Sequence, residues 1–480
     1  MSPLDLVRDR AVARTRIVIV GAGVGGLALS RAFARRGVPH VVLEREAEPG
    51  GVIHTIRTDG RVLEAGPQRL RLTRSLHQLV QALGLEDPLV VAPRGLPLFI
   101  YRRGALRLAP LSLLELRRTD LFSWADKLRI FAEPLTRPAR DHETVANYFI
   151  RRFGRAAYQD LLGPLFGGLY ASDPADMLVR HALLPTLREL GGTRSTVLAL
   201  LRREINSGAS VRARHGDRDG GDRVGGAPAC SFRSGLRTLT DAMSHSVREH
   251  VRLRSAALAI EHFRSPTAEE ESRNVDDIPS PRAGGEAEVA LTPTERAGAY
   301  RVVTDDGDLT ASDVVLTCPA SDAASLLRPL APRAAAALDA LHYNRIAIVY
   351  LIAEGVRTGM GYQVSFAEPL HTRGVTFNHS LFARDGVYTA FLGGARDPDP
   401  DRLSDDAIAA TAAREFEQVT GRTGRPIHVT HARIPAWDRS WTALDDVRLP
   451  PGIHLCANYE SRIGVLGRIA RAEQLAAAIQ

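Results

Sequence analysis

Residues 16–55 read RIVIVGAGVGGLALSRAFARRGVPHVVLEREAEPGGVIHT and contain one complete structural pattern. An apolar run at 17–20 is typical of a buried strand, and it leads directly into the glycine-rich turn GAGVGG at 21–26. A helical segment follows, and then a second apolar run at 41–43, which Glu44 closes. Strand, glycine turn, helix, strand and acid in this order predict a βαβ unit that binds a dinucleotide.

Each part of this pattern has a physical role in binding a nucleotide. Gly21 permits a tight turn out of the strand, Gly23 leaves the backbone open to the pyrophosphate, and Gly26 lets the helix pack against the sheet. The helix N-terminus offers free N–H groups to the phosphates. Glu44 follows at about the 20-residue spacing expected of the carboxylate that binds the ribose hydroxyls. Its negative charge disfavours the extra phosphate of NADP.

The composition is that of a globular protein with an arginine-rich surface. The 480 residues are 44% hydrophobic and 24% charged, and the formal net charge is +7. Lys127 is the only lysine, and no basic run interleaved with aromatic residues indicates nucleic-acid binding. The three cysteines, Cys230, Cys318 and Cys456, are far apart, which argues against a disulfide framework and against a metal site.

The sequence also indicates where the protein resides. The N-terminal residues lack the apolar core of a signal peptide, and no segment is uninterruptedly apolar over the roughly 18 residues of a membrane-spanning helix. We therefore expect a cytoplasmic protein, with any membrane contact peripheral and on the inner face of the membrane.

A helical region is expected at 111–202, where Ser123 and Asp126 form a capping box at a helix start. Lys127 is expected to face solvent. Four apolar residues at helical spacing form one face of this region: Leu121, Trp124, Leu128 and Phe131. Core packing is the ordinary interpretation of such a face, and contact with a membrane or a substrate channel is the alternative.

Two further segments resemble the large superfamily of FAD-dependent oxidoreductases. Gly50-Gly51 is similar to the second glycine pair of that superfamily, which passes close to the phosphates and the flavin. Glu64-Ala65-Gly66-Pro67 is similar to a segment that borders the isoalloxazine ring in those enzymes. The resemblance implies FAD, rather than NAD, as the cofactor.

Over nearly its whole length the chain resembles one family, the oxygen-dependent protoporphyrinogen oxidases, which are FAD enzymes related to monoamine oxidase and phytoene desaturase. The segments that carry the resemblance lie at 143–154, 162–173, 232–239, 359–361, 378–382 and 455–469. The last of these is similar to the strand–turn–helix that covers the flavin pyrimidine in that family. The resemblance implies that a backbone N–H near Gly464 and Val465 meets the flavin O2 at a helix N-terminus.

The glycine pattern and the resemblance together predict two sets of site residues. The predicted cofactor-binding residues are Gly21, Gly23, Gly26, Glu44, Arg45, Gly50, Gly51, Gly66, Pro67, Ala257, Asn458, Gly464 and Val465. The predicted substrate-binding residues are Leu98, Leu165, Phe166, Gly167, Gly168, Met360, Gly361 and Gln363. No catalytic side chain and no metal ligand is expected, because the flavin carries the chemistry.

The chain departs from the family pattern at the substrate. Leu98 stands where many members carry an arginine that pairs with a substrate propionate, Met360 replaces an aromatic residue, and Gln363 replaces an apolar one. A guanidinium suits a carboxylate. Four arginines are open alternatives for that role: Arg69, Arg71, Arg94 and Arg102.

The resemblance implies a fold and a domain order. We expect an α/β fold with a discontinuous Rossmann-like FAD-binding domain, a mixed α+β substrate domain and a helical membrane-associating domain. FAD-binding parts are expected at 14–85, 231–263, 299–328 and 441–480. The other parts are a mainly helical substrate- and membrane-associating domain at 86–205, a substrate-binding domain at 329–440, and flexible segments at 206–230 and 264–298.

The activity that the resemblance implies is the oxidation of protoporphyrinogen IX to protoporphyrin IX in heme biosynthesis. A hydride would pass from the substrate to FAD, and dioxygen would reoxidise the flavin and yield hydrogen peroxide. Expected partners are the porphyrinogen, dioxygen, a membrane surface and a ferrochelatase-like downstream enzyme, with a homodimer as the assembly and no nucleic acid.

Other functions stay open. Coproporphyrinogen III, with four carboxylates rather than two, is an alternative substrate, and another FAD-dependent desaturase or oxidase is an alternative enzyme. A non-catalytic flavoprotein is a third alternative. An amine oxidase is disfavoured, because those relatives usually place a lysine near flavin N5, whereas Lys127 lies in the expected helical region.

Overall fold

The computed structural model describes residues 13–189, 194–199, 227–263, 300–398, 402–460 and 464–479. The flexible segment predicted at 264–298 lies outside these residues, as does most of that at 206–230. The chain forms two compact units. One comprises Met1–Gly51, Thr240–Asp339 and Asp446–Gln480, and the other comprises Val52–Leu239 and Ala340–Asp445. We call them the parallel-sheet unit and the mixed-sheet unit. The functional domain boundaries stay predictions.

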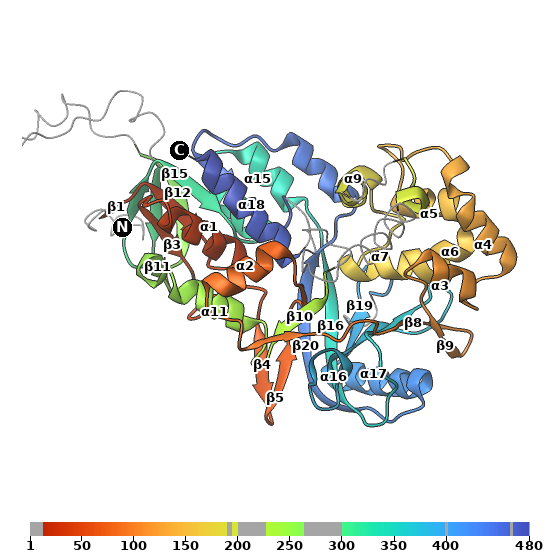
Figure 1. Cartoon of the computed structure of the whole chain (residues 1–480). Coiled ribbons are helices and arrows are strands. Elements are labelled where there is room, and N and C mark those ends of the chain that lie inside the picture. Colours follow the sequence, from red (N-terminus) through yellow and green to blue (C-terminus); the bar gives the residue numbers. More distant parts are fainter. Residues whose placement is uncertain are drawn as a thin grey trace, which may run out of the picture. The chain divides into compact units, whose positions relative to one another are not determined.

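A five-stranded parallel sheet organises the parallel-sheet unit (Figure 1). Its strands, in spatial order, are β11 (Val251–Arg252), β3 (His40–Leu43), β2 (Ile17–Val20), β15 (Asp313–Leu316) and β21 (Ile453–Leu455). All four residues of β2 are buried, as expected of a parallel strand covered on both faces. The strands predicted at 17–20 and 41–43 are therefore confirmed to within one residue.

A second sheet and several helices complete the parallel-sheet unit. The four-stranded sheet has the order β1 (Ala13–Arg14), β14 (Leu309–Ala311), β13 (Tyr300–Thr304) and β12 (Ala257–His262). The helices are α1 (Val24–Ala34), α11 (Arg237–His245, which begins in the other unit), α14 (Ala320–Leu327), α15 (Pro332–Asp339) and α18 (Val465–Ala478). Helix α1 packs along α18 (Figure 1).

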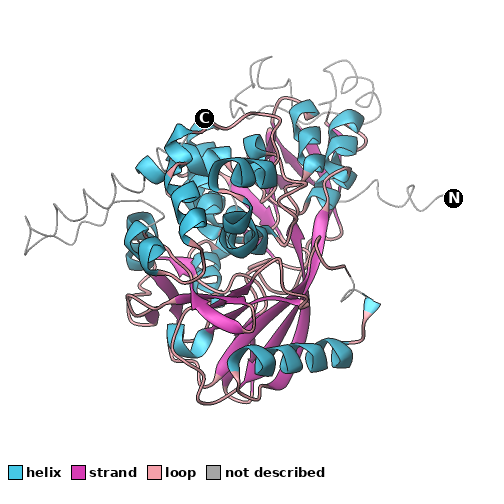
Figure 2. Ribbon diagram, turned by 90° about the vertical axis from the view of Figure 1, so that its right-hand side faces the viewer, coloured by secondary structure: helices cyan, strands magenta, loops and turns pink. Residues whose placement is uncertain are grey.

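A seven-stranded sheet organises the mixed-sheet unit (Figure 2). Its strands, in spatial order, are β20 (Arg425–Pro435), β16 (Tyr343–Ile352), β19 (Val387–Gly393), β18 (Thr372–Phe377), β17 (Gly361–Val364), β8 (Leu98–Arg102) and β9 (Ala105–Leu108). Only the β17–β8 pair is parallel. Two small sheets accompany it: β6 (Leu70–Arg71), β10 (Ala229–Phe232) and β7 (Leu89–Val91), and β4 (Thr55–Thr58) with β5 (Arg61–Glu64).

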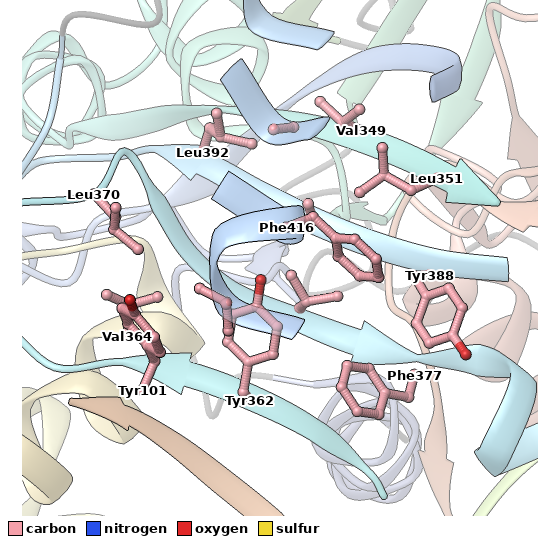
Figure 3. Close-up of a cluster of buried hydrophobic side chains, with 14 of the residues drawn as sticks. Tyr101, Val349, Leu351, Tyr362, Val364, Leu370, Phe377, Tyr388, Leu392 and Phe416 are labelled. Carbon is pink, nitrogen blue, oxygen red and sulfur yellow. The ribbon is translucent and has the colours of Figure 1, made fainter. Parts of the chain in front are cut away.

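One face of the seven-stranded sheet is the core of this unit. Alternate side chains of β8, β17, β18 and β19 pack there with helix α17 (Asp405–Thr420), and Phe416 of α17 lies among them (Figure 3). The rings of Phe377 and Tyr388 meet edge to face at 5.2 Å between their centres. Because side chains alternate along a strand, the intervening residues face the other side of the sheet, where β16 and β19 form a second, smaller cluster.

The helices of the mixed-sheet unit lie mostly between residues 74 and 189. They are α2 (Arg74–Ala82), α3 (Leu113–Arg118), α4 (Trp124–Phe131), α5 (Val145–Phe153), α6 (Arg155–Ala157), a π-helical turn (Tyr158–Leu162), α7 (Gly163–Tyr170), α8 (Val179–Ala182) and α9 (Leu184–Glu189). Short 3₁₀ turns lie at Glu133–Leu135 and Arg439–Asp446, and α16 (Asn378–Phe382) follows β18. Among the described residues no helix has the length and apolar character needed to cross a membrane.

Two expectations about α4 are wrong, and one is confirmed. The capping box of Ser123 and Asp126 is present. Lys127 is buried, with 6% exposure, because its ammonium donates to the carbonyl of Arg117 at the end of α3 and lies over the Trp124 ring. Core packing fails for most of the apolar face: Leu121 is buried, but the exposed members are Trp124 at 71%, Leu128 at 68% and Phe131 at 41%.

Candidate functional site: a nucleotide cradle and a sheet wall

The predicted nucleotide residues gather at one edge of the parallel sheet. Gly21 follows β2, Glu44 follows β3, Thr317 follows β15 and Cys456 follows β21. These positions are the carboxyl ends of parallel strands, which is the edge where open α/β sheets bind ligands. A Cβ added to Gly25 would lie 3.1 Å from the Cys456 carbonyl oxygen, so the C-terminal segment lies against the start of α1.

The three glycines of the first turn are needed for different reasons. Gly21 has a φ of 106°, and a Cβ there would lie 2.8 Å from the Thr317 hydroxyl oxygen. A Cβ on Gly26 would lie 2.0 Å from the Gly21 carbonyl oxygen, which only a glycine avoids. A Cβ on Gly23 would meet no atom within 4 Å in the part of the chain that the structure describes. Gly23 therefore borders open space at the start of α1, where no side chain caps the helix N–H groups.

The second glycine pair lies against the first. The Gly50 N–H donates to the Ala22 carbonyl oxygen at 2.9 Å, and Gly50 forms a β-bridge with Gly23. A Cβ on Gly51, whose φ is 57°, would lie 3.3 Å from the Gly23 Cα. The structure thus brings residues far apart in the predicted pattern into one backbone-lined cradle.

Glu44 holds this cradle together. Its buried carboxylate accepts the backbone N–H of Ala22 at 2.7 Å and that of Glu46 at 3.0 Å. A carboxylate has about four acceptor sites, so two remain for ribose hydroxyls. Arg45 is exposed and pairs with Asp322 at 3.1 Å, so its guanidinium already has an acidic partner.

The remaining predicted cofactor residues of this unit lie on its later segments. Gly464 caps α18 with a φ of 107°, and a Cβ there would meet no atom of the residues that the structure describes within 4 Å, while Val465 is the first helical residue. Asn458 is half-buried in the turn after β21. Ala257 lies on β12, two residues beyond Ser255, whose N–H donates to the Glu44 carbonyl oxygen at 2.8 Å.

The cradle fits the phosphates of FAD. Among the described residues, open space at Gly23 and Gly464 coincides with two helix N-termini that lack side-chain caps, those of α1 and α18. Free N–H groups at helix N-termini and the positive ends of the helix dipoles stabilise anions. The residues that would bind the dinucleotide are therefore those of the glycine turn, with Glu44 at the ribose.

Four of the predicted substrate residues lie at the face of the seven-stranded sheet opposite its core: Leu98, Gly168, Gly361 and Gln363. Tyr362 belongs to the core, so its neighbours Gly361 and Gln363 face the other side. Leu98 pairs with Gly361 across the β8–β17 register and shares that face. Helix α7 packs against β17, and a Cβ on Gly168 would lie 3.0 Å from the Gln363 Oε1. We call this face, with α7, the sheet wall.

Packing explains most glycines of this unit. A Cβ on Gly361 would lie 2.0 Å from the Val375 carbonyl oxygen, and one on Gly167 would lie 2.9 Å from that of Ser172. At Gly66 the distance to the Val52 carbonyl oxygen would be 1.9 Å. Close backbone approach therefore requires these glycines whether or not a ligand is present.

The other predicted substrate residues lie in apolar surroundings. The Phe166 ring contacts those of Phe149 and Tyr170, with centre distances of 5.7 and 5.0 Å. Met360 packs against the cluster that contains Ala229, Leu381 and Phe382. Leu165, in the same helix as Phe166, is half-buried. A wall of this character suits a flat, mostly apolar ligand.

A buried ion pair, absent from the sequence-based prediction, supports Gly66 and Pro67. Glu64 accepts from Arg384 at 2.8 Å, from the Leu236 N–H at 2.9 Å and from the Thr55 hydroxyl at 2.8 Å. Both charged side chains are more than nine-tenths buried. Arg384 could not be found from the sequence, because it is one of 62 basic residues and carries no local pattern.

A chain of amides joins the same segment to the sheet wall. The Tyr350 hydroxyl and the Gln68 amide both donate to the Glu64 carbonyl oxygen at 2.7 Å. Asn378 donates to Gln68 at 3.4 Å and to the Thr389 hydroxyl at 2.8 Å. Residues 64–68 therefore lie beside the strands that carry the wall. The predicted contact of Gly66 and Pro67 with flavin stays a prediction.

The thiols are poor nucleophiles. Burial raises the pKa of Cys318 to about 12 and that of Cys456 to about 11, so both stay protonated at neutral pH. Burial likewise raises the pKa of the Cys230 thiol to about 12. Within the described ranges, no group of three or more histidine, cysteine, aspartate or glutamate side chains gathers as metal ligands would.

Comparisons with known proteins agree with this geometry. A family model described as flavin containing amine oxidoreductase matches residues 24–278 and 286–456. The chloroplastic protoporphyrinogen oxidase of Nicotiana tabacum is 28% identical over 87% of this chain and 74% of its own length. The coproporphyrinogen III oxidase of Propionibacterium freudenreichii is 28% identical over 70% of this chain and 63% of its own.

Solved structures share the fold. A structure from Exiguobacterium sp. 255-15, provisionally named a protoporphyrinogen oxidase, has a TM-score of 0.69 at 22% identity and covers 98% of this chain and 99% of its own. Cyclohexylamine oxidase from Brevibacterium oxydans has a TM-score of 0.62 at 14% identity, over 97% and 98% of the two chains. At these identities the likeness concerns the fold alone.

Proposed function

The chain belongs to the family of flavin containing amine oxidoreductases, and we propose that within this family it oxidises a porphyrinogen. The protein is an FAD-dependent oxidoreductase with the mixed α/β fold of that family. Its protoporphyrinogen oxidase relatives match most of both chains, so the likeness extends well beyond the glycine turn.

The observation that carries the proposal is the sheet wall. Leu98, Gly361 and Gln363 share one face of the sheet, and Gly168 of α7 lies against Gln363. This face offers apolar side chains and backbone to a flat macrocycle. The side chain of Gln363 adds an amide group to the face. A ligand held this way is shielded from water on the side of the wall.

FAD, when bound, supplies the hydride acceptor, and its reoxidation by dioxygen yields hydrogen peroxide. The chain's own residues then bind and orient. Gly23 and the N-terminus of α1 bind the phosphates, Glu44 binds the ribose, and the N–H groups at Gly464 and Val465 stabilise negative charge on the flavin. No acid–base side chain is assigned a proton transfer.

Protoporphyrinogen IX is the proposed substrate, and coproporphyrinogen III is the alternative. Relatives with both names match this chain at 28% identity. The family resemblance leads us to expect an arginine that contacts a substrate propionate, and Leu98 stands in its place. The two substrates differ in how many carboxylates they carry, two in protoporphyrinogen IX and four in coproporphyrinogen III.

The experiment mixes the purified, FAD-loaded protein aerobically with each porphyrinogen in parallel. We expect porphyrin fluorescence to rise faster than in the protein-free mixture, with hydrogen peroxide formed in step. The faster substrate identifies the pathway. A yellow protein that accelerates neither oxidation refutes the proposal and favours a desaturase or a non-catalytic flavoprotein.

The exposed face of α4 supports a further part of the proposal, which is peripheral contact with a membrane. Trp124 and Leu128 are exposed there, and Leu135 in the following turn is 89% exposed. Arg117 and Arg118, at the end of α3, are exposed nearby and suit anionic lipid head groups. A homodimer and delivery of product to a ferrochelatase-like enzyme complete the proposal.

A further inference from the structure

Two glycines make room for the amide of Gln363. Gly374 pairs with Gln363 across the β17–β18 ladder, and a Cβ there would lie 2.8 Å from Nε2 and 2.9 Å from Oε1 of the amide. A Cβ on Gly168 of α7 would lie 3.0 Å from the same Oε1. Neither glycine has a positive φ, so the backbone does not demand glycine at either position. The amide therefore fills space that two other side chains would occupy.

This amide is open to a ligand. Gln363 is half-buried, and Gly168, which lies beside its Oε1, is exposed. Among the residues that the structure describes, no hydrogen bond reaches the side chain of Gln363. An amide offers two donor hydrogens and an oxygen with two lone pairs. A ligand that covers the sheet wall displaces water from this amide, so it binds well only where it supplies hydrogen bonds in place of the water.

The charge around the amide decides which ligand group suits it. Ile100 pairs with Gln363 in the β8–β17 register and is buried. Arg102 is the only charged residue that β8 and β17 place on this face, and it forms an ion pair with the buried Asp160. A carboxylate held against these two strands would find no free countercharge on them, and burying it there would be costly. A neutral hydrogen-bond donor is the better partner for the amide oxygen.

We propose that the amide oxygen of Gln363 accepts from the pyrrole N–H groups of the porphyrinogen, and that this contact distinguishes substrate from product. The inference rests on the proposed function, because a porphyrinogen supplies these groups. Its saturated methylene bridges let the pyrrole rings tilt, so that their N–H groups point out of the mean plane toward a wall. The porphyrin product is conjugated and flat, and its remaining N–H groups lie in the plane, out of reach of an amide beneath the ring.

The experiment compares wild type with Gln363→Leu, which removes the amide, and Gln363→Glu, which keeps an oxygen acceptor. Gln78→Leu is the matched control, because Gln78 is an exposed glutamine of α2 with no assigned role. Each FAD-loaded protein is assayed with the porphyrinogen as free acid and as its full methyl ester, whose carboxyl groups carry no charge. The inhibition constant of the porphyrin product, the FAD content and the melting temperature are measured on the same samples.

We expect Gln363→Leu to raise KM about 3- to 10-fold with acid and ester alike, the range for a lost neutral hydrogen bond, and to leave kcat near the wild-type value. The inhibition constant of the porphyrin should not rise, because the flat product does not use the contact. With the ester, Gln363→Glu should keep the wild-type KM, since a carboxylate also accepts from N–H groups. Gln78→Leu should match wild type throughout.

A second variant moves the amide without removing it. The Cβ of Gly374→Ala would meet the far end of the Gln363 side chain, which is flexible, so the melting temperature should stay close to wild type. The displaced amide should raise KM for the porphyrinogen in the same direction as Gln363→Leu. This variant decides the question if Gln363→Leu loses FAD or unfolds early, and a wild-type KM in Gly374→Ala would then refute the inference.

Other results also overturn it. An unchanged KM in Gln363→Leu removes the contact, and a loss confined to the free acid assigns the amide to a substrate carboxylate. A KM in Gln363→Glu as high as that in Gln363→Leu, measured with the ester, makes the amide a donor. An equal rise in the inhibition constant of the porphyrin shows that the amide does not distinguish substrate from product. Failure of the wild type to oxidise any porphyrinogen is distinct, because it refutes the proposed function first.

Discussion

In the parallel-sheet unit a Cβ at Gly23 or Gly464 would meet no atom of the described residues within 4 Å, whereas in the mixed-sheet unit a Cβ at Gly361 would lie 2.0 Å from the Val375 carbonyl oxygen. Space for a ligand is therefore open at Gly23 and Gly464 among the described residues, whereas backbone packing fills the space at Gly361. Glycine in a predicted site identifies a ligand contact only where the space beside it is open. The predictions below test that distinction.

The largest effect is expected at the buried ion pair of the mixed-sheet unit. Arg384→Met leaves Glu64 buried without its cation, which costs about 3–5 kcal/mol of unfolding free energy. Denaturant unfolding of the FAD-loaded protein measures the loss. The control is Arg94→Met, at an exposed position, and its unfolding free energy should stay within about 0.5 kcal/mol of wild type. A loss at Arg384 no larger than that of the control would contradict a structural role for the pair.

Gly361→Ala should damage the fold before it damages binding. The added methyl meets the Val375 carbonyl, and the φ of 140° is unfavourable for alanine, so we expect a destabilisation of about 1–3 kcal/mol. Thermal unfolding measures it, and FAD content reports whether the parallel-sheet unit persists. If the melting temperature stays at the wild-type value while turnover falls, Gly361 contacts the substrate and is not required for backbone packing. That outcome would contradict the distinction drawn between the two units.

Gly23→Ala should do the reverse. The methyl has room in the protein but occupies the path of the pyrophosphate, so FAD affinity should fall at least about tenfold, or roughly 1.4 kcal/mol, with the apoprotein as stable as wild type. Flavin titration and apoprotein unfolding measure the two quantities. Gly26→Ala is the matched variant, because its Cβ would lie 2.0 Å from a carbonyl oxygen and should reduce stability and FAD binding together.

The smallest effect on stability is expected at the exposed face of α4. Trp124→Ser removes a ring that is 71% exposed and should change unfolding free energy by less than about 0.5 kcal/mol. Co-sedimentation with anionic lipid vesicles should fall several-fold, because the ring supplies apolar area for the interface. Leu121→Ser, at a buried position of the same apolar run, should instead destabilise the protein. Unchanged vesicle binding by Trp124→Ser would remove the membrane proposal for this face.

The sequence was informative where contacts are local. The strand at 17–20, the glycine turn, Glu44 and the capping box at Ser123 all rest on neighbours within one βαβ unit or one helical turn, and all are present. The ladder partners of these strands confirm the parallel sheet. Short-range patterns predict such features because the same few residues supply both the signal and the contacts.

Prediction failed where burial depends on distant segments. Lys127 was expected in solvent, but the end of α3 provides a carbonyl for its ammonium. Core packing was the ordinary interpretation of the four apolar residues around it, with a membrane or channel face as the alternative, and three of the four are exposed. Helical spacing identifies an apolar face, and only the packing of other helices decides whether that face is buried.

By itself, the sequence determined the nucleotide cradle and the family resemblance. A glycine turn followed by an acidic residue is a pattern that lies within one short stretch of the chain. Only the tertiary structure decided that Arg384 balances Glu64 and that Gln363 lies against Gly168. Arg384 and Glu64 are separated by 320 residues. A pairing at that separation leaves no periodic trace in the sequence, since it exists only after strands and helices have brought the two side chains together.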